Sequence, residues 1–348
     1  MRKPFLIGGV SVAPGKRAEI NLAVPALYTH NPMSCPVYVV HGKRSGPVLF
    51  LSGAIHGDEI NGVEIIRRVL NRKSLQSLKG TLVAVPVVNV FGFIAQTRYL
   101  PDRRDLNRSF PGSEKGSLAA RIAHIFLEEI VAKCTHGIDL HTAAIHRDNF
   151  PQVRANLDDP EIDRMARAFN SPVIIDTTIA EGTLRKAATA LNIPVIVYEA
   201  GEALRFDEVA IRAGERGIIS TMRELGMLPK LKAGKRKSEP FVARSSSWVR
   251  AQKSGILRAN RRLGEKVGRG ELLGVLSDPF GSKDEDVTAH HEGIIIGRTN
   301  LPLVNEGEAL FHIARFDDAV SVVETVEDFQ NEMDPATDST PSAEPPIV

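Results

Sequence analysis

Between Pro47 and about Leu228, short apolar runs rich in Val and Ile alternate with longer amphipathic runs. Short apolar runs bounded by turn signals favour buried strands, and amphipathic runs of ten or more residues favour helices. The expected strands are Val48–Ala54, Thr81–Val88, Gly137–His141, Val173–Thr178 and Val195–Tyr198. The expected helices are Glu59–Asn71, with Asp58 as N-cap, Ser117–Ala132, Glu161–Asn170, Thr183–Leu191 and Glu208–Leu225. Strands and helices alternating in this order predict an α/β domain.

The alternation ends between Pro229 and Ser247, in a basic stretch followed by three serines. We interpret it as a solvated junction rather than a nucleic-acid contact, because charge runs are commonly solvated loops. Beyond it, short Gly-punctuated segments predict a small all-β domain, and the acidic, Pro-rich end of the chain predicts disorder. The expected units are an α/β domain with an N-terminal β segment at 1–228, a linker at 229–247, an all-β domain at 248–326 and a disordered tail at 327–348.

Composition narrows the function classes. Lys and Arg total 44 against 42 Asp and Glu, so the formal charge is only +2 and no global field attracts nucleic acid or a membrane. A small molecule is therefore the more natural partner. We also expect neither a signal peptide nor a membrane-spanning segment. Two cysteines are too few for a disulfide framework, which favours the reducing cytoplasm.

The strongest chemical signal is the sequence His-Gly-Asp-Glu at 56–59, where an expected strand gives way to a helix. Strand ends in α/β sheets commonly carry sites, and an imidazole and a carboxylate three residues apart across a Gly turn can face one ion. Zinc accepts these nitrogen and oxygen ligands and keeps a fourth position open in catalytic sites. A third ligand, His141, ends a later strand, and strand alternation places Asp139 on the same face. His56, Glu59 and His141 are therefore the candidate ligands of one Zn²⁺ per chain, and Asp139 is a candidate for orienting His141.

The other histidines are weaker candidates for ligands. His146 follows His141 by five residues, so it would face the opposite side of a continued strand. His124 lies within an expected helix, whereas His136 and the pair at 290–291 adjoin turn signals. We expect these histidines to be structural.

Two further features point toward hydrolysis. The polar loop from Arg98 to Gly112 carries four arginines, and a guanidinium group binds a carboxylate through paired hydrogen bonds or polarises a carbonyl oxygen. Glu199 ends another apolar strand, where a carboxylate can take a proton from water and pass it to a leaving amine. The alternative interpretation is a solvated basic loop and an ordinary loop carboxylate.

Three motifs occur in the order found in the succinylglutamate desuccinylase and aspartoacylase family, which the chain resembles over roughly its first domain. They are His-Gly-Asp-Glu at 56–59, Asp-Leu-Asn-Arg at 105–108 and Asp-Leu-His at 139–141. The resemblance implies a mixed sheet flanked by helices, as in zinc carboxypeptidases. It also implies His56, Glu59 and His141 as zinc ligands and Glu199 as general base.

The same resemblance implies roles for residues of the loop from Arg98 to Gly112. Asn107 and Arg108 would bind the substrate carboxylate, Arg98 would polarise the scissile carbonyl, and Asp105 would orient the first ligand. The loop is longer than in aspartoacylases, so Arg103 or Arg104 is an alternative to Arg98. We also regard Arg104 as a candidate for binding the substrate.

The second domain resembles a lipoyl or biotinyl barrel-sandwich over 263–273, 292–295 and 305–310. Lys283 lacks the sequence context of a modified carrier lysine, so we expect an ordinary exposed side chain. We expect this domain to flank or cap the zinc cleft and to restrict which acyl groups enter. A chain that ended after Leu228 and kept full activity and selectivity would contradict that role.

The sequence therefore predicts a cytoplasmic zinc-dependent deacylase of a small N-acylated carboxylate, such as an N-acyl amino acid. Neither nucleic acid nor a membrane is an expected partner, and a homo-oligomer is compatible with the sequence. One alternative is a zinc carboxypeptidase that acts on peptides. Another is a non-catalytic metal-binding or interaction module.

Overall fold

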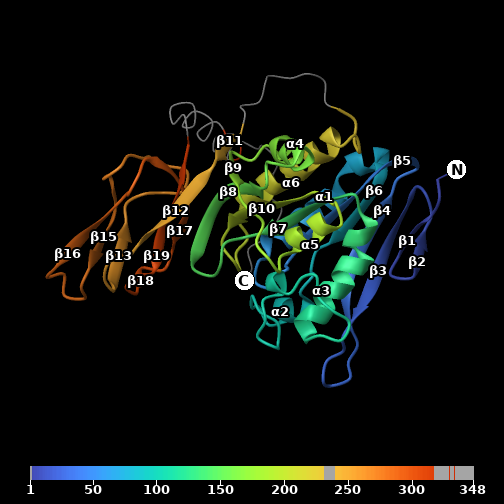
Figure 1. Ribbon diagram of the computed structural model, residues 1–348, viewed down its shortest axis with the longest axis horizontal. Coiled ribbons are helices and arrows are strands. Elements are labelled where there is room, and N and C mark those ends of the chain that lie inside the picture. Colours follow the sequence, from blue (N-terminus) through green and yellow to red (C-terminus); the bar gives the residue numbers. More distant parts are fainter. Residues whose placement is uncertain (1, 231–239, 317–328, 330–332, 334–348) are drawn as a thin grey trace, which may run out of the picture.

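Figure 1 shows the computed structural model of the protein, which describes residues 2–230, 240–316, 329 and 333. The α-helices are α1 (Asn61–Asn71), α2 (Val90–Ile94), α3 (Leu118–Glu129), α4 (Pro160–Phe169), α5 (Leu184–Ala190) and α6 (Glu208–Glu224). Three short 3₁₀ helices are η1 (Lys73–Ser77), η2 (Leu106–Arg108) and η3 (Val131–Lys133). No helix in the described ranges has the length and apolar character needed to cross a membrane.

The strands fall into an N-terminal and a C-terminal group. The first group is β1 (Phe5–Ile7), β2 (Val10–Val12), β3 (Lys16–Val24), β4 (Met33–His41), β5 (Arg44–Gly53), β6 (Lys79–Val85), β7 (His136–His141), β8 (Arg147–Ala155), β9 (Val173–Asp176) and β10 (Val195–Gly201). The second is β11 (Phe241–Ala243), β12 (Ser245–Arg250), β13 (Gly255–Ala259), β14 (Lys266–Val267), β15 (Leu272–Ser277), β16 (Asp284–Thr288), β17 (Gly293–Thr299), β18 (Leu303–Val304) and β19 (Ala309–Arg315).

One mixed sheet runs through most of the molecule, in the order β12-β19-β17-β8-β10-β7-β5-β6-β4-β3. Its centre is parallel, since β5 pairs with β6 and β7, and β7 pairs with β10, whereas β8 runs antiparallel to β10. The carboxyl ends of β5, β7 and β10 therefore meet at one edge, where α/β sheets build their sites. The predicted α/β class with a mixed, helix-flanked sheet is confirmed.

Helices cover both faces of the central sheet (Figure 1). Alternate residues of β5 point to opposite sides, so that Leu49 and Leu51 join the core under α1, α4 and α6, and Phe50 joins the core under α2, α3 and α5. All three side chains are fully buried. The central strands are apolar on both faces for this reason, which matches their Val- and Ile-rich sequences.

The C-terminal β region is joined to this sheet by backbone pairing. Strand β17 pairs with β8, and β19 and β12 extend the sheet further. Strands β16, β15, β13 and β18 form a second sheet, and the two layers enclose a separate apolar core. Strand β8 changes partner along its length, from β17 at 147–149 to β9 at 152–155, and Pro151, which has no N–H to donate, lies at the change.

Several local expectations differ from the structure. The first helix begins at Asn61 with Ile60 as N-cap and no side-chain cap, so the prediction of Asp58 as N-cap is wrong. The reason is that Glu59 N donates to His56 O at 3.1 Å, which closes a turn before the helix. The other expected helices start within one residue of their predicted positions, and they are capped by the side chains of Ser117, Asp159, Thr183 and Asp207.

Parts of the expected linker and tail can be compared with the structure. Residues 241–247 of the expected linker carry β11, which pairs with β9, and the start of β12, whereas 231–239 lie outside the described residues. Most of the expected disordered tail also lies outside them. Its two described residues, Phe329 and Met333, are buried against the main core, where Phe329 packs on Phe150.

Candidate active site

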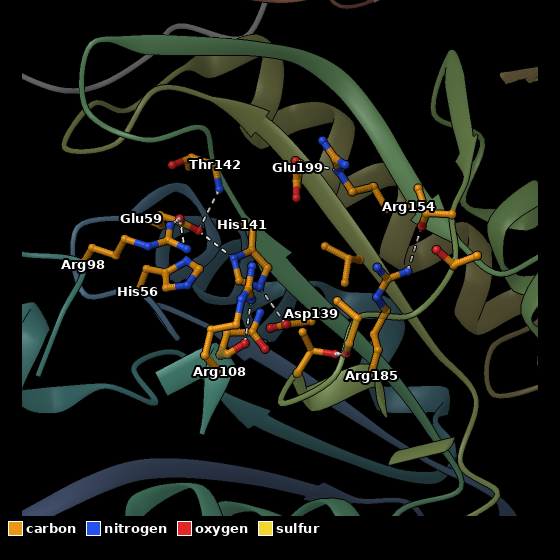
Figure 2. A pocket seen from close by; sticks show the side chains of 16 residues that line it. His56, Glu59, Arg98, Arg108, Asp139, His141, Thr142, Arg154, Arg185 and Glu199 are labelled. Carbon is orange, nitrogen blue, oxygen red and sulfur yellow. Dashed lines mark hydrogen bonds and ion pairs between the residues drawn. The ribbon is translucent and has the colours of Figure 1, made fainter. Parts of the chain in front are cut away.

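Three predicted ligands converge at the carboxyl edge of the sheet (Figure 2). Nδ1 of His56 lies 2.6 Å from Glu59 Oε1, and Nδ1 of His141 lies 2.7 Å from Glu59 Oε2. One donor atom from each residue falls within 4.8 Å of the others. The three side chains are at most 5% exposed. Two imidazoles thus face one buried carboxylate.

The turn that carries His56 and Glu59 depends on its glycine. A Cβ atom added at Gly57 would lie 1.9 Å from the carbonyl carbon of Gly92, because the start of α2 packs directly on the turn. Ala54, just before the turn, has φ +48°, a left-handed conformation that is uncommon for residues with a Cβ. The chain therefore leaves β5 through a tightly packed bend, which aims both ligands at the same point.

Each imidazole is held from behind by an aspartate. Nε2 of His56 lies 3.1 Å from Asp105 Oδ1, and Nε2 of His141 lies 2.7 Å from Asp139 Oδ2. Asp139 is itself fixed by a 2.7 Å hydrogen bond from the Ser52 hydroxyl on β5. Both rings therefore present Nδ1 toward Glu59 and use Nε2 for an orienting carboxylate, the arrangement that metal-binding histidines usually show.

The two imidazoles and the carboxylates around them shift each other's pKa values. Burial would lower the pKa of His56 and of His141, but the facing carboxylates outweigh it and raise both. Conversely, burial would raise the pKa of Glu59 and of Asp105, but the neighbouring imidazole charges outweigh it and hold both well below their usual range. The cluster therefore stabilises positive charge in front of Glu59.

These residues fit a divalent metal ion on the chemistry of their donors. Two imidazole nitrogens and one carboxylate oxygen are the ligand set of many catalytic zinc sites, with the fourth position left for water or substrate. The open side here is a cavity of about 410 Å³, a size suited to a small ligand. Its lining residues are His56, Glu59, Arg98, Asn107, Arg108, Asp139, His141, Thr142, Arg154, Thr177, Thr178, Ala180, Thr183, Arg185, Val197 and Glu199.

Arg98 lies beside the ligand cluster. It donates to Asp105 Oδ2 from Nη2 at 2.8 Å and from Nε at 3.1 Å, and to Glu59 Oε1 from Nη1 at 3.3 Å. Its side chain is 28% exposed and borders the cavity. Arg104, in contrast, is not in the cavity lining: its side chain is 63% exposed, and its nearest acid is Asp102 at 4.0 Å. Arg103 is exposed as well.

Asn107 and Arg108 reach the cavity from η2. The Asn107 Oδ1 atom accepts a 2.9 Å hydrogen bond from Leu184 N at the start of α5, so the carboxamide is fixed and its Nδ2 faces no partner among the described residues. Arg108 is exposed, and among the described residues it donates only to the adjacent backbone carbonyl of Asn107, at 2.7 Å. Both side chains therefore keep donors available for a ligand.

Two cavity arginines, Arg185 and Arg154, were not predicted. Arg185 comes from the first turn of α5, and its only hydrogen bond within the described ranges goes to Thr177 Oγ1 at 3.3 Å. Burial lowers the pKa of Arg185, and the charges of Glu199 and Asp139 counter this in part. No acid in the described part of the chain lies within ion-pair distance of it. An arginine in the first turn of a helix resembles an ordinary surface residue, so the sequence carried no signal for it.

Glu199 lies in β10, two residues before its end, and directly beside His141 of β7 in the parallel register. Its Oε2 atom lies 2.9 Å from Arg154 Nε and accepts a 3.2 Å hydrogen bond from Asn149 Nδ2. Figure 2 shows Arg154 extending along the cavity wall toward this carboxylate. The other histidines considered in the sequence, such as His124 and His146, do not line the cavity.

Comparisons with known proteins give the family of the chain. Residues 45–225 match the family model described as "Succinylglutamate desuccinylase/Aspartoacylase catalytic domain". An N-alpha-acetyl-L-2,4-diaminobutyric acid deacetylase from Halomonas elongata is 27% identical over 294 residues, which cover 80% of this chain and 85% of that protein.

Solved structures show the same fold. A succinylglutamate desuccinylase/aspartoacylase from Rhodobacter sphaeroides aligns with a TM-score of 0.77 and 24% identity, over 86% of this chain and 96% of that one. The product-bound ectoine utilization protein from Ruegeria pomeroyi aligns with a TM-score of 0.77 and 22% identity, over 86% and 95%. The likeness of the C-terminal region to a carrier domain stays a prediction; Lys283, in the β15–β16 turn, is exposed. Since the family model spans more than half of the chain, the protein belongs to the succinylglutamate desuccinylase/aspartoacylase family.

Proposed function

We propose that the protein is a zinc-dependent deacylase that hydrolyses the amide bond of a small N-acyl amino acid. The observation that carries the proposal is the cluster of His56, Glu59 and His141, oriented by Asp105 and Asp139 and open to a cavity that Glu199 and several arginines line. Membership in a family of amide hydrolases supports it, as does the similarity to a deacetylase of an N-acetylated amino acid.

His56, Glu59 and His141 are the residues that would hold the ion. Zinc bound there would lower the pKa of a water molecule and act as a Lewis acid toward the scissile carbonyl. Asp105 and Asp139 would keep the two imidazole rings in the orientation and tautomer that leaves Nδ1 free. The carboxylate of Glu59 would balance part of the charge of the ion.

Glu199 would serve as the general base and acid. Its carboxylate takes a proton from the attacking water and then delivers a proton to the nitrogen of the leaving amine. Arg98 lies at the ligand cluster, where its guanidinium group would stabilise negative charge on the carbonyl oxygen. In the structure its donors point at Asp105 and Glu59, so this role requires the group to share one donor with the substrate.

The substrate carboxylate would be bound by Asn107 and Arg108, which both keep donors without a partner among the described residues. Arg185 would be a second anchor for negative charge, because a largely buried guanidinium group with no ion-pair partner in the described part of the chain gains most from an anionic ligand. The 410 Å³ cavity accommodates an N-acyl amino acid more readily than a peptide.

We also propose a cytoplasmic location, because Cys35 and Cys134 are both free and buried, as suits a reducing compartment. The domain division proposed from the sequence needs one refinement. The C-terminal region has its own apolar core but shares the central sheet with the catalytic domain.

The test combines metal analysis with a substrate panel. Bound zinc is measured in the purified protein, and N-acetyl, N-formyl and N-succinyl amino acids and short peptides are assayed with the wild type and Glu199→Gln. We expect one zinc per chain, turnover of at least one N-acyl amino acid, and a fall in kcat of about 10²–10⁴-fold for Glu199→Gln.

Glu181→Gln is a matched control: among the described residues this exposed glutamate pairs only with Lys186, so the change should leave turnover unchanged. Absence of turnover on every amide, despite bound zinc, would refute the deacylase. Turnover of peptides alone would indicate a carboxypeptidase instead. Unchanged activity in Glu199→Gln would remove the proposed base.

A further inference from the structure

The carboxylate of Glu199 is held asymmetrically. Oε2 faces both Arg154 Nε, at 2.9 Å, and Asn149 Nδ2, at 3.2 Å, whereas Oε1 has no partner among the described residues. The Arg154 contact is close but is not aligned as a hydrogen bond, so its attraction is chiefly electrostatic. One oxygen is therefore anchored, and the other is left free for a proton.

Both anchors come from β8, which pairs with β10 in a fixed register. Glu199 lies opposite Gln152, and Val197 lies opposite Arg154, so Glu199 and Arg154 emerge on the same face of the sheet. Asn149 follows a register shift on the same strand pair, which brings it to the same carboxylate. The position of Glu199 is thus coupled to the placement of β8.

The other side of β8 is bounded by the C-terminal strands. Asn149 lies opposite Gly297 of β17, and a Cβ atom at Gly297 would lie 2.9 Å from Asn149 Oδ1 and 3.2 Å from the Cβ of His312. His312 stacks on Trp248 with ring centroids 4.6 Å apart, and its Nε2 pairs with Ser246 Oγ at 2.9 Å.

His312 is also close to the second anchor. It is 6% exposed, and burial together with the charge of Arg154 lowers its pKa to about 4, so the ring stays neutral beside that guanidinium group. Trp248 of β12 therefore stacks on His312, His312 and Asn149 both border the space above Gly297, and Asn149 holds Glu199. No C-terminal residue lines the cavity itself within the described ranges.

We propose that Arg154 and Asn149 are positioning residues for Glu199, and that the C-terminal strands β17 and β19 hold them in place through Gly297 and His312. The C-terminal region then affects turnover through the back of β8 rather than as a wall of the cavity. The inference rests on the proposed role of Glu199. It differs from the earlier expectation that this region caps the cleft.

The expected effect follows from geometry. A displacement of about 1 Å in a catalytic group is enough to lower the rate about 10²-fold. Loss of either anchor frees Glu199 to rotate but leaves the substrate anchors Asn107, Arg108 and Arg185 intact. We therefore expect kcat to fall about 10–100-fold in Arg154→Gln and in Asn149→Ala, with KM changed less than about threefold.

Three comparisons separate positioning from general damage. Arg154→Lys keeps the charge and should recover part of kcat. Gly297→Ala, made in the C-terminal region, should reproduce the effect of Asn149→Ala. Gly268→Ala is the matched control, because a Cβ at Gly268 meets only Glu271 Oε2 at an ordinary 3.5 Å, and it should leave kcat unchanged.

A double-mutant cycle supplies the decisive readout. In a Glu199→Asp background the shortened carboxylate no longer reaches its anchors, so adding Arg154→Gln should lower kcat less than about twofold further. Zinc content and thermal unfolding of each variant show that the proteins compared are folded and loaded. If Arg154→Gln fails to fold, Arg154→Lys and Asn149→Ala carry the same cycle.

Each outcome decides the matter. An equal loss in both backgrounds, or a rise in KM with unchanged kcat, would mean that Arg154 acts on the substrate and would overturn the inference. Normal kcat in all anchor variants, while Glu199→Gln is inactive, would overturn the inference but leave the proposed function standing. Full activity of Glu199→Gln would remove the proposed role of Glu199 as base, and the inference with it, but not the deacylase itself.

Discussion

Replacing Arg185 with methionine should make the protein more stable and less active at the same time. The guanidinium group is largely buried, yet within the described ranges its only hydrogen bond is the 3.3 Å contact with Thr177. Carboxylates of Glu199 and Asp139 act on it from a distance and offset only part of its lost hydration. A buried cation with so few partners indicates that an anionic ligand binds to it.

The magnitudes follow from these contacts. Charge-assisted hydrogen bonds contribute about 1.5–3 kcal/mol each, so losing a two-bond clamp on a substrate carboxylate should cost about 3–4 kcal/mol after water replaces part of it. That corresponds to about 10²–10³-fold in kcat/KM, mainly through KM. Replacing a poorly compensated buried charge by an apolar side chain of similar volume should raise the free energy of unfolding by about 1–2 kcal/mol.

The assay pairs steady-state kinetics on the best N-acyl amino acid with urea unfolding. Arg185→Lys keeps the charge but not the fork, so its kcat/KM should lie between those of the wild type and Arg185→Met. Arg108→Met is the matched control: Arg108 is exposed, so this change should raise KM without a gain in stability. If Arg185→Met lowers the free energy of unfolding and leaves KM unchanged, the prediction is refuted, and Arg185 stabilises the fold instead of binding the substrate.

Two further predictions concern the framework of the site. Burial, reinforced by the charge of Asp207, raises the pKa of Asp148 to about 6, so its neutral form stabilises the native state fully below pH 3.8 and that stabilisation is lost as pH rises toward 6. Asp148→Asn should therefore be more stable than the wild type by about 1–3 kcal/mol at pH 8, with the gap closing near pH 4; a constant gap in urea unfolding at both pH values would contradict this. Gly57→Ala should lower zinc affinity more than tenfold, because the added Cβ collides with the backbone of α2 and moves His56 and Glu59; equilibrium dialysis against zinc checks it, and unchanged affinity would mean that the turn adapts.

Much of the fold was predictable because the central strands are buried on both faces and their sequences are correspondingly apolar. Strand β8 was missed since its sequence holds Pro151, charged residues and no alternation, and since one of its partners, β17, lies more than a hundred residues along the chain. The two strands β3 and β4 were anticipated only as an unspecified N-terminal β segment. Local sequence cannot specify such long-range pairing.

The candidate site divides in the same way. His56, Glu59 and His141 were predictable because strand ends and a Gly turn leave few directions for their side chains. Asn149 and Arg154 were not, because they reach Glu199 through the register of β8 against β10. Arg185 was not predictable, because an arginine on a helix is equally common on a solvated surface and in the wall of a cavity. Arg104 was a candidate for binding the substrate only because it lies near Asn107 and Arg108 in the sequence. In the structure its side chain is 63% exposed.

The shared strand β8 has a consequence for experiments that dissect the chain. A protein ending after Leu228 would lack β17, so residues 147–149 would become an open edge with unpaired amides and carbonyls. Such edges invite pairing between chains and aggregation. Inactivity of that fragment would then report misassembly instead of altered selectivity. The contribution of the C-terminal region is therefore better measured by single substitutions in the intact chain.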